Sequence, residues 1–361
     1  LLAFGIVMVL SASAPSALAE TGNSYTYFIS QLQYAVLGLI VMWLASRLDY
    51  NFYKRLYKII YVFSVLILFL VLIPGIGASG GGATRWVDFG FVSFQPSEFT
   101  KIGLIIGLAG YLTEHKDELK SFTKGFLAPL AMAGVPILIA FFIQNHLSVG
   151  IVMGLITVIM MLVAGTRLLH FIIAGSVAIG VGGSALGIYL STAGEAASEA
   201  SFRISRILNF FNPWEDATGV GWQTIQGLYA IGSGGIFGVG LGESKQKYLY
   251  VSEPQNDFIF AILAEELGFV GCIAVIILFA LFVLRGINIA MSSKDMFGSL
   301  LATGITALVM VQVVLNIAVV TNSIPNTGMS LPFFSAGGTA LILLLGMCGI
   351  LLNISKNREK V

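Results

Sequence analysis

The run FGSLLATGITALVMVQVVLNIAVV, residues 297–320, contains no Asp, Glu, Lys or Arg. As a helix that rises about 1.5 Å per residue, it is long enough to cross the roughly 30 Å hydrocarbon core of a bilayer. Comparable runs lie at 1–14, 30–46, 57–74, 97–112, 125–143, 147–164, 168–190, 257–285 and 336–354. The sequence therefore predicts about ten membrane-spanning helices.

The overall composition also indicates an integral membrane protein. Hydrophobic residues make up 57% of the chain and charged residues 10%, with a mean hydropathy of +0.92. Soluble domains have about 45–50% apolar and about 25% charged residues. The alternation of a β-barrel is absent, and only helices and closed barrels satisfy their own backbone polar groups in lipid. We expect an all-α polytopic bundle, one membrane domain over residues 1–361, with a long extracytoplasmic loop at 191–256.

The first residues have two interpretations. The apolar stretch before Ala17-Leu18-Ala19 imitates a signal peptide with a small-residue cleavage site. We favour a genuine span, in which the chain begins partway through its first helix. Cys272 and Cys348 fall inside predicted spans, where we expect two free thiols that behave as small hydrophobes.

Basic residues are distributed unevenly between the two ends of the predicted helices. Thirteen of the nineteen Lys and Arg residues fall on one side, which the positive-inside rule makes cytoplasmic, together with both termini. The six on the other side are Arg85, Lys101, Arg203, Arg206, Lys245 and Lys247. They could bind an anionic ligand such as a lipid pyrophosphate, or anchor the chain by snorkelling.

The two explanations apply differently along the chain. Arg203 and Arg206 belong to a stretch that also resembles an amphipathic interfacial helix, so both explanations remain open. Arg85, Lys245 and Lys247 lie beside glycine-rich backbone, where we favour ligand binding.

One carboxylate stands at the mouth of a predicted span, in YLYVSEPQNDFIFA (residues 248–261). An ionisable residue at this depth costs several kcal/mol unless it is paired or used, so Asp257 is a candidate functional residue. Just upstream, the glycine-interrupted residues 223–242 predict a re-entrant segment, tolerated only against protein or a wet cavity. That cavity would lie beside Asp257.

Other charged residues have plausible structural roles. Glu98 and Lys101 lie three residues apart after Pro96, so they share a helical face and can pair. Such a pair could be purely structural or could also shape a catalytic cavity. Glu265 and Glu266 follow Asp257 on the next predicted helix, where we expect hydrogen bonds that pack helices together.

Several familiar sites are excluded. The letters GIGASG at 75–80 match a dinucleotide-binding fingerprint, but they follow a membrane helix instead of a strand, which leaves a pliable loop or a simple connector. His146 has no second ligand at zinc spacing. The sequence contains no Walker motif, nucleophile elbow or nucleic-acid signature, so we expect neither an organic cofactor nor a nucleic-acid partner.

Six runs together resemble the SEDS family (shape, elongation, division and sporulation), which includes the FtsW, RodA and SpoVE proteins. They are FQPSE at 94–98, NPW at 212–214, GWQ at 221–223, DFIFA at 257–261, EELG at 265–268 and LPFFSAGGT at 331–339. The resemblance covers nearly the whole chain. It implies a ten-helix peptidoglycan glycosyltransferase in the cytoplasmic membrane that polymerises lipid II on the outer face. A class B penicillin-binding protein, which is a transpeptidase, is the implied partner.

The resemblance also implies roles for individual residues. Asp257 matches the essential aspartate of the family, Glu98 and Lys101 match cavity-lining positions, and Ser335 is expected to contact the substrate. Two differences from the family pattern limit how far these residue roles can be transferred to this chain. The family often has QPDLGT where this chain has QNHLSV at 144–149, so the role of that aspartate cannot be carried over to His146. Ala336 replaces the usual tyrosine.

The implied reaction joins the 4-hydroxyl of one sugar to C1 of another that carries a lipid pyrophosphate. We expect Asp257 to take the hydroxyl proton as general base, with inversion at C1. Desolvation would raise the pKa of Asp257 above its usual value of about 3.9. Arg, Lys or a divalent cation, Mg or Mn, would stabilise the departing pyrophosphate.

Two other functions compete with polymerisation. A bundle with broken helices and an intramembrane carboxylate could flip lipid II across the membrane, or the chain could be a scaffold that only positions a partner enzyme. The sequence leaves open a role in division, elongation or sporulation, although SEPQ at 252–255 and NSIPN at 322–326 favour the division and sporulation branch.

Overall fold

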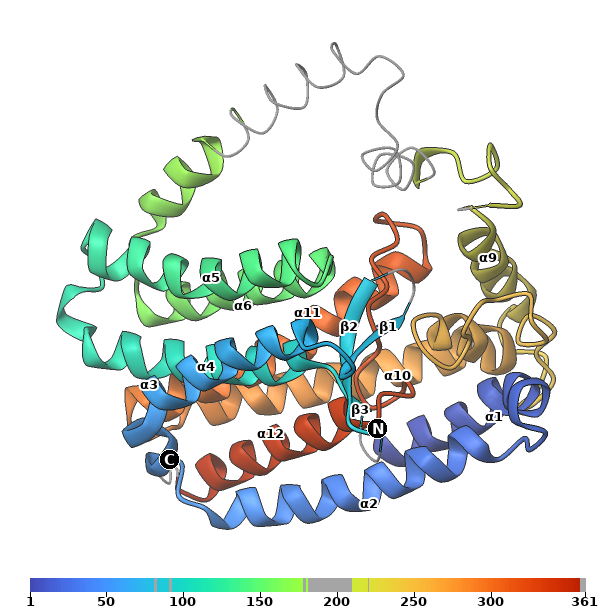
Figure 1. The fold of residues 1–361 in the computed structure, drawn as a ribbon, viewed down its shortest axis with the longest axis horizontal. Coiled ribbons are helices and arrows are strands. Elements are labelled where there is room, and N and C mark those ends of the chain that lie inside the picture. The colour runs from blue at the N-terminus through green and yellow to red at the C-terminus, as the bar shows by residue number, and fades with distance from the viewer. Residues whose placement is uncertain (81–82, 91–92, 178–179, 181–209, 220, 358–361) are drawn as a thin grey trace.

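The computed structural model describes residues 1–80, 83–90, 93–177, 180, 210–219 and 221–357. Figure 1 shows long helices that lie roughly side by side, with a small sheet beside α4. The main helices are α1 (Leu2–Thr21), α2 (Thr26–Arg47), α3 (Asn51–Leu66), α4 (Pro96–Glu114), α5 (Ala128–Phe142), α6 (Leu147–Ala164), α9 (Trp222–Gly234), α10 (Ile259–Met291), α11 (Met296–Val320) and α12 (Thr339–Lys356). The predicted all-α membrane architecture is confirmed.

Eight of the described helices are long and apolar enough to cross a membrane. They correspond to α1, α2, α3 with its continuation η1 (Ile67–Leu72), α5 with η3 (Thr123–Leu127), α6, α10, α11 and α12. The span predicted at 97–112 is α4, whose hydropathy is lowered by Glu98 and Lys101, although most of its side chains are buried. Of the span predicted at 168–190, the described part is an apolar helix, Leu168–Val177.

The centre of the bundle is formed by α4, α6, α10, α11 and α12. Helix α11 is buried over most of its length and contacts α4, α6 and α10. At the edge, α2 packs closely against α12, because a Cβ on Gly349 would lie 2.3 Å from the Met42 carbonyl oxygen. Small residues allow membrane helices to approach in this way. Helix α1 packs against α2 and α10, as expected for a genuine span.

The residues between η1 and α4 form a feature that the sequence did not predict. The strands β1 (Gly77–Gly80), β2 (Ala83–Asp88) and β3 (Ser93–Phe94) make an antiparallel sheet in the order β1-β2-β3. The glycine-rich stretch at 75–80, predicted as a loop or connector, therefore includes an edge strand. The sheet matters for the site because β2 carries Arg85.

Helix α10 is interrupted near its N-terminal end. Gly268 has φ 65°, and the chain beyond α9 crosses the break. The N–H of Val239 donates to the carbonyl of Glu265 at 3.0 Å, and the N–H of Phe269 donates to the carbonyl of Gly235 at 2.9 Å. Glycine is required here, since a Cβ on Gly268 would lie 2.3 Å from the Gly238 nitrogen. Residues 223–242, for which the sequence predicts a re-entrant segment, form most of α9 and the turns that follow it, and re-entrance into the membrane stays a prediction.

Candidate active site

Asp257 lies in a turn immediately before α10 and is half-buried. The turn is fixed from α11, where Asn316 is completely buried. The Asn316 amide donates to the backbone carbonyl of Asp257 at 2.8 Å and to that of Met329 at 2.5 Å. One side chain thus holds two distant loops together, and the carboxylate of Asp257 extends from a fixed backbone.

A second brace reaches the same turn from the loop before α12. The Ser335 hydroxyl donates to the carbonyl of Asn256 at 2.8 Å and accepts from the N–H of Leu331 at 2.7 Å. The N–H of Ala336 donates to the carbonyl of Gln255 at 2.9 Å. Ser335 was predicted to contact substrate, but its one proton serves this brace, and only a lone pair is left for a ligand.

Gly328 connects Asp257 with the head of α6. A Cβ on Gly328 would lie 3.2 Å from Oδ2 of Asp257, and the residue has φ +63°. The adjacent carbonyl of Thr327 accepts a hydrogen bond from the Ser148 hydroxyl in the first turn of α6. Residues at the start of α6 are therefore one short loop away from the carboxylate.

The first turn of α4 holds the predicted ion pair. Nζ of Lys101 lies 2.8 Å from Oε1 of Glu98, with the two side chains 2% and 17% exposed. The pairing expected from their spacing is confirmed. Pairing offsets the cost of burying the lysine charge, while Glu98 keeps some exposed surface.

Arg85 and His146 extend this polar cluster. Arg85 donates to the backbone carbonyls of Gln144 at 3.2 Å and Asn145 at 3.0 Å, so β2 fixes the turn that leads into α6. Nε2 of Gln95 lies 3.2 Å from Nδ1 of His146. Burial, together with the charges of Arg85 and Lys101, lowers the pKa of His146 to about 3.

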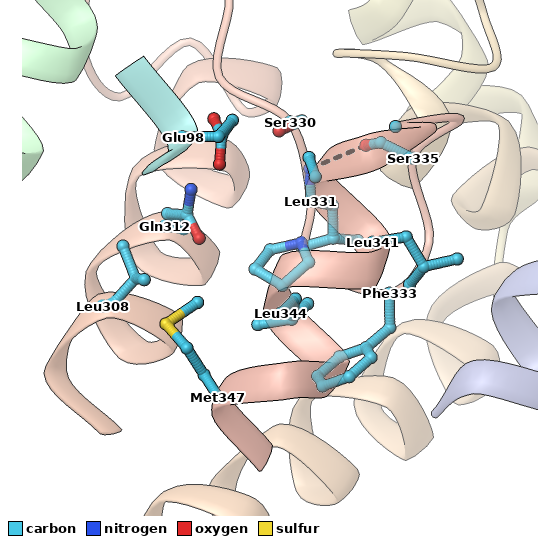
Figure 2. A pocket seen from close by; sticks show the side chains of 13 residues that line it. Glu98, Leu308, Gln312, Ser330, Leu331, Phe333, Ser335, Leu341, Leu344 and Met347 are labelled. Carbon is cyan, nitrogen blue, oxygen red and sulfur yellow. Dashed lines mark hydrogen bonds between the residues drawn. The ribbon is translucent and has the colours of Figure 1, made fainter. Parts of the chain in front are cut away.

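A pocket lies between α4, α11, α12 and the loop before α12 (Figure 2). In Figure 2, Glu98 and Ser330 lie at its upper end, and Met347 and Phe333 at its lower end. The lining residues are Glu98, Leu308, Gln312, Ser330, Leu331, Pro332, Phe333, Ser335, Gly337, Ala340, Leu341, Leu344 and Met347. The pocket is therefore polar at one end and apolar at the other, which suits a ligand with both characters.

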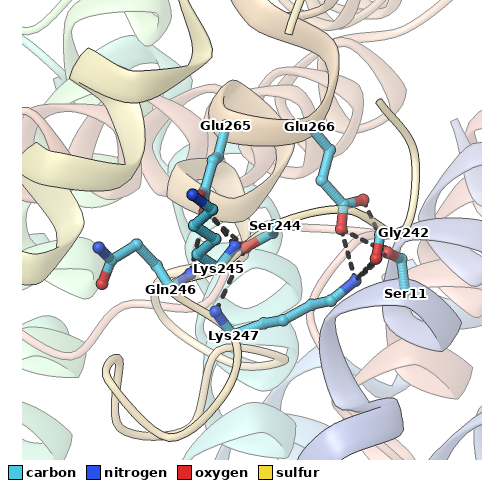
Figure 3. A network of polar contacts seen from close by, with 8 residues as sticks. All are labelled: Ser11, Gly242, Ser244, Lys245, Gln246, Lys247, Glu265 and Glu266. Carbon is cyan, nitrogen blue, oxygen red and sulfur yellow. Dashed lines mark hydrogen bonds and ion pairs between the residues drawn. The ribbon is translucent and has the colours of Figure 1, made fainter. Parts of the chain in front are cut away.

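Lys247 belongs to a different, buried cluster, which Figure 3 shows. Its Nζ lies 2.8 Å from Oε1 of Glu266 and 2.6 Å from the carbonyl of Gly242, and it donates to the Ser11 hydroxyl at 3.3 Å. The side chains of Lys247 and Glu266 are 4% and 0% exposed. This geometry makes Lys247 a structural residue and does not support the ligand-binding role predicted from the sequence.

Glu265 and Lys245 complete the cluster. Glu265 accepts hydrogen bonds from the Ser244 hydroxyl and from the N–H groups of Lys245 and Gln246. The helix-packing role expected for both acids is confirmed for Glu266, which accepts from Ser11 of α1, whereas Glu265 binds the loop at 244–246. Lys245 uses only its backbone here and is exposed, so its ammonium remains a candidate for ligand binding.

The remaining predictions concern residues and groups beyond these contacts. Arg203 and Arg206 lie outside the described residues. Within the described ranges, no group of three or more His, Cys, Asp and Glu side chains could hold a metal ion. The divalent cation therefore stays a prediction. Sequence reasoning missed Asn316, although the two amides in the largely apolar run 297–320, Gln312 and Asn316, were a usable signal.

Residues 1–360 match the FtsW, RodA and SpoVE family model, which is described as cell cycle protein. The chain is 43% identical over 356 residues to stage V sporulation protein E of Bacillus subtilis, covering 99% of this chain and 94% of the relative. It is 41% identical over 352 residues to a probable peptidoglycan glycosyltransferase, FtsW, of Geobacter sulfurreducens, covering 98% and 91%.

Solved structures agree with the fold. A chain of a peptidoglycan synthase complex superimposes with a TM-score of 0.76 and 26% identity, covering 100% of this chain and 98% of that one. The rod shape determining protein RodA of Thermus thermophilus superimposes with a TM-score of 0.66 and 24% identity, covering 100% and 97%. Because its identity to this chain is only 24%, the RodA match supports the fold alone.

Proposed function

The chain belongs to the FtsW, RodA and SpoVE family of cell cycle proteins, and on that basis we propose that it polymerises lipid II into glycan strands. Its relatives include proteins named as peptidoglycan glycosyltransferases, and this protein is likewise a multi-pass membrane glycosyltransferase. The flippase and scaffold alternatives are not favoured, because neither accounts for that shared enzymatic activity. The distribution of basic residues supports an active site on the outer face of the cytoplasmic membrane, with both termini in the cytoplasm.

The observation that carries the mechanism is the fixed position of Asp257 at the start of α10, between the braces from Asn316 and Ser335. We assign Asp257 as general base. Its carboxylate takes the proton of the acceptor 4-hydroxyl. The electron pair left on that oxygen then forms the new bond to C1 of the donor sugar. The bond from C1 to the pyrophosphate oxygen breaks, and undecaprenyl pyrophosphate leaves with that electron pair. Attack opposite the leaving group inverts C1.

The pyrophosphate leaves with its negative charge already present, so cations are more useful than a second acid. Lys245 and Arg85 are the described candidates, and Arg203 and Arg206 remain predicted ones. Glu98 lines the pocket from α4, where its ion pair with the buried Lys101 holds it in place.

We also propose a partner. One structural neighbour is part of a peptidoglycan synthase complex that coordinates polymerisation and crosslinking. Crosslinking is the chemistry of a transpeptidase, and a class B penicillin-binding protein would supply it beside this chain. The product strand of one subunit would then be the substrate of the other.

The experiment that tests the function uses purified protein, lipid II and gel analysis of glycan products, with and without the transpeptidase partner. We expect glycan ladders, at a higher rate with the partner present. A parallel assay follows labelled lipid II in reconstituted vesicles. Movement of lipid II across the bilayer without any glycan product would refute polymerisation and restore the flippase alternative.

Gly328→Ala tests whether the position of the Asp257 carboxylate matters for this activity. The new methyl group would press on Oδ2 at 3.2 Å, so we expect the polymerisation rate to fall by at least about 10-fold. Gly22→Ala is the matched control, because Gly22 has φ +74° and no atom within 4 Å of its added Cβ. Both variants carry the left-handed strain of about 1 kcal/mol. Equal rates in the two variants would show that Asp257 is not crowded by residue 328.

A further inference from the structure

The head of α6 carries an imidazole that the proposed mechanism does not use. His146 is the residue before α6 and is 9% exposed. Its Nδ1 lies 3.2 Å from Nε2 of Gln95. An amide NH₂ group can only donate, so Nδ1 must accept. The ring proton is therefore on Nε2, and the imidazole presents a hydrogen-bond donor on its other side.

Burial and, to a smaller extent, two neighbouring cations keep this imidazole neutral. Arg85 binds the carbonyls of Gln144 and Asn145, which directly precede His146, and Lys101 acts on the ring from α4. A third positive charge in this buried position would be unfavourable, in agreement with the lowered pKa. Within the described part of the chain, Nε2 has no hydrogen-bond partner. A donor in a positive environment is suited to an acceptor that carries negative charge.

The position of His146 relative to Asp257 follows from the first turn of α6. Ser148, two residues after His146, donates to the carbonyl of Thr327. Gly328, which follows Thr327, is so close to Asp257 that an added Cβ would lie 3.2 Å from Oδ2. The same loop thus contacts both the start of α6 and the proposed base. A ligand that places its reacting carbon beside Asp257 would have its neighbouring groups near the head of α6.

We infer that His146 is a substrate-binding residue that donates a hydrogen bond from Nε2 to a phosphate oxygen of the lipid-linked sugar donor. The inference rests on the proposed function, because it names one contact in the same site. A sugar hydroxyl would gain little from the nearby cations, whereas a phosphate oxygen is stabilised by the donor and by the positive charge together.

The test measures binding without catalysis. Farnesyl diphosphate serves as the probe, titrated into the full-length protein in lipid nanodiscs, with farnesol as the matched lipid that lacks phosphate. We expect His146→Ala to weaken binding of farnesyl diphosphate by about 10-fold. His146→Gln keeps an amide donor and should recover most of the loss. His115→Ala, at the far end of α4, is the control and should bind like the unaltered protein.

The outcomes separate the inference from the proposed function. Equal affinity of the unaltered protein and His146→Ala for farnesyl diphosphate would overturn the contact, even if glycan polymerisation were demonstrated. An equal loss with farnesol would also overturn it, because phosphate would then play no part. Weakened binding of farnesyl diphosphate alone would support the contact, even if no glycan were made.

A second measurement covers the case in which His146→Ala does not fold. The chain has three histidines, so nitrogen NMR of histidine-labelled protein gives three imidazoles to follow. We expect one imidazole, protonated at Nε2 alone at neutral pH, to shift its Nε2 resonance when farnesyl diphosphate binds. Disappearance of that signal in His146→Gln assigns it. A spectrum in which the His146 resonances stay unchanged on saturation would overturn the inference.

Discussion

Asp257→Asn is expected to lower lipid II polymerisation by roughly 1,000-fold, because an amide cannot accept the proton that a general base removes. The substitution changes little else in the site. Asn316 binds the backbone carbonyl of residue 257, and Ser335 binds that of Asn256, so both braces survive the change. The measurement is the initial rate of glycan formation from purified lipid II, with thermal unfolding as the test of the fold.

Glu243→Gln provides the matched control for this variant. Glu243 is exposed in the same long segment and undergoes the same exchange of a carboxylate for an amide. It should polymerise lipid II at the rate of the unaltered protein. If Asp257→Asn retained more than about a tenth of that rate, the base would have to be another group, since general bases typically contribute about 100-fold or more.

Lys247→Ala should cause the largest loss of stability, about 3–5 kcal/mol, because it leaves the Glu266 carboxylate buried without its cation. Ser11 would remain as a hydroxyl partner, but it brings no charge. Lys245→Ala is the control, since that lysine is exposed and its cluster contact is made by the backbone. The free energy of unfolding, measured in detergent by denaturant titration, distinguishes the two variants.

A double variant sharpens the interpretation. Replacing Lys247 with Met and Glu266 with Leu together removes both buried charges, and paired apolar replacement of buried ion pairs is often tolerated. We expect the double variant to be more stable than Lys247→Ala. If Lys247→Ala were as stable as Lys245→Ala, the ion pair would have no structural role and ligand binding by Lys247 would again be open.

The sequence predicted the helices well because long uncharged runs leave a chain few alternatives in lipid. It also predicted the Glu98–Lys101 pair, since that contact depends only on local helical spacing. It could not distinguish Lys245 from Lys247, which are two residues apart in the same glycine-rich neighbourhood. Their roles differ because Lys247 binds Ser11 and Glu266. These two partners are distant from the lysines in the chain, and no local sequence pattern connects them.

For the candidate site, the sequence singled out Asp257 but not the residues that support it. Asp257 stood out as an acid at the end of an apolar run, whereas Asn316 is one of two amides inside such a run and Gly328 follows a turn. Both acquire their importance from tertiary contacts, which bring residues 316 and 328 to residue 257. The small sheet was missed because its first strand is rich in glycine, a residue that is depleted in strands.

The interruption of α10 at Gly268 restricts where this protein can be engineered. The N–H groups of Phe269 and Val270 have their acceptors at Gly235 and Ile236, on a crossing segment instead of the preceding helical turn. A tag or extra residue spliced in between 235 and 240 would shift those acceptors out of register. Each amide stranded in hydrocarbon would cost several kcal/mol. Fluorescent or affinity fusions will therefore be tolerated better elsewhere than in this short crossing, which has a fixed length despite its run of glycines.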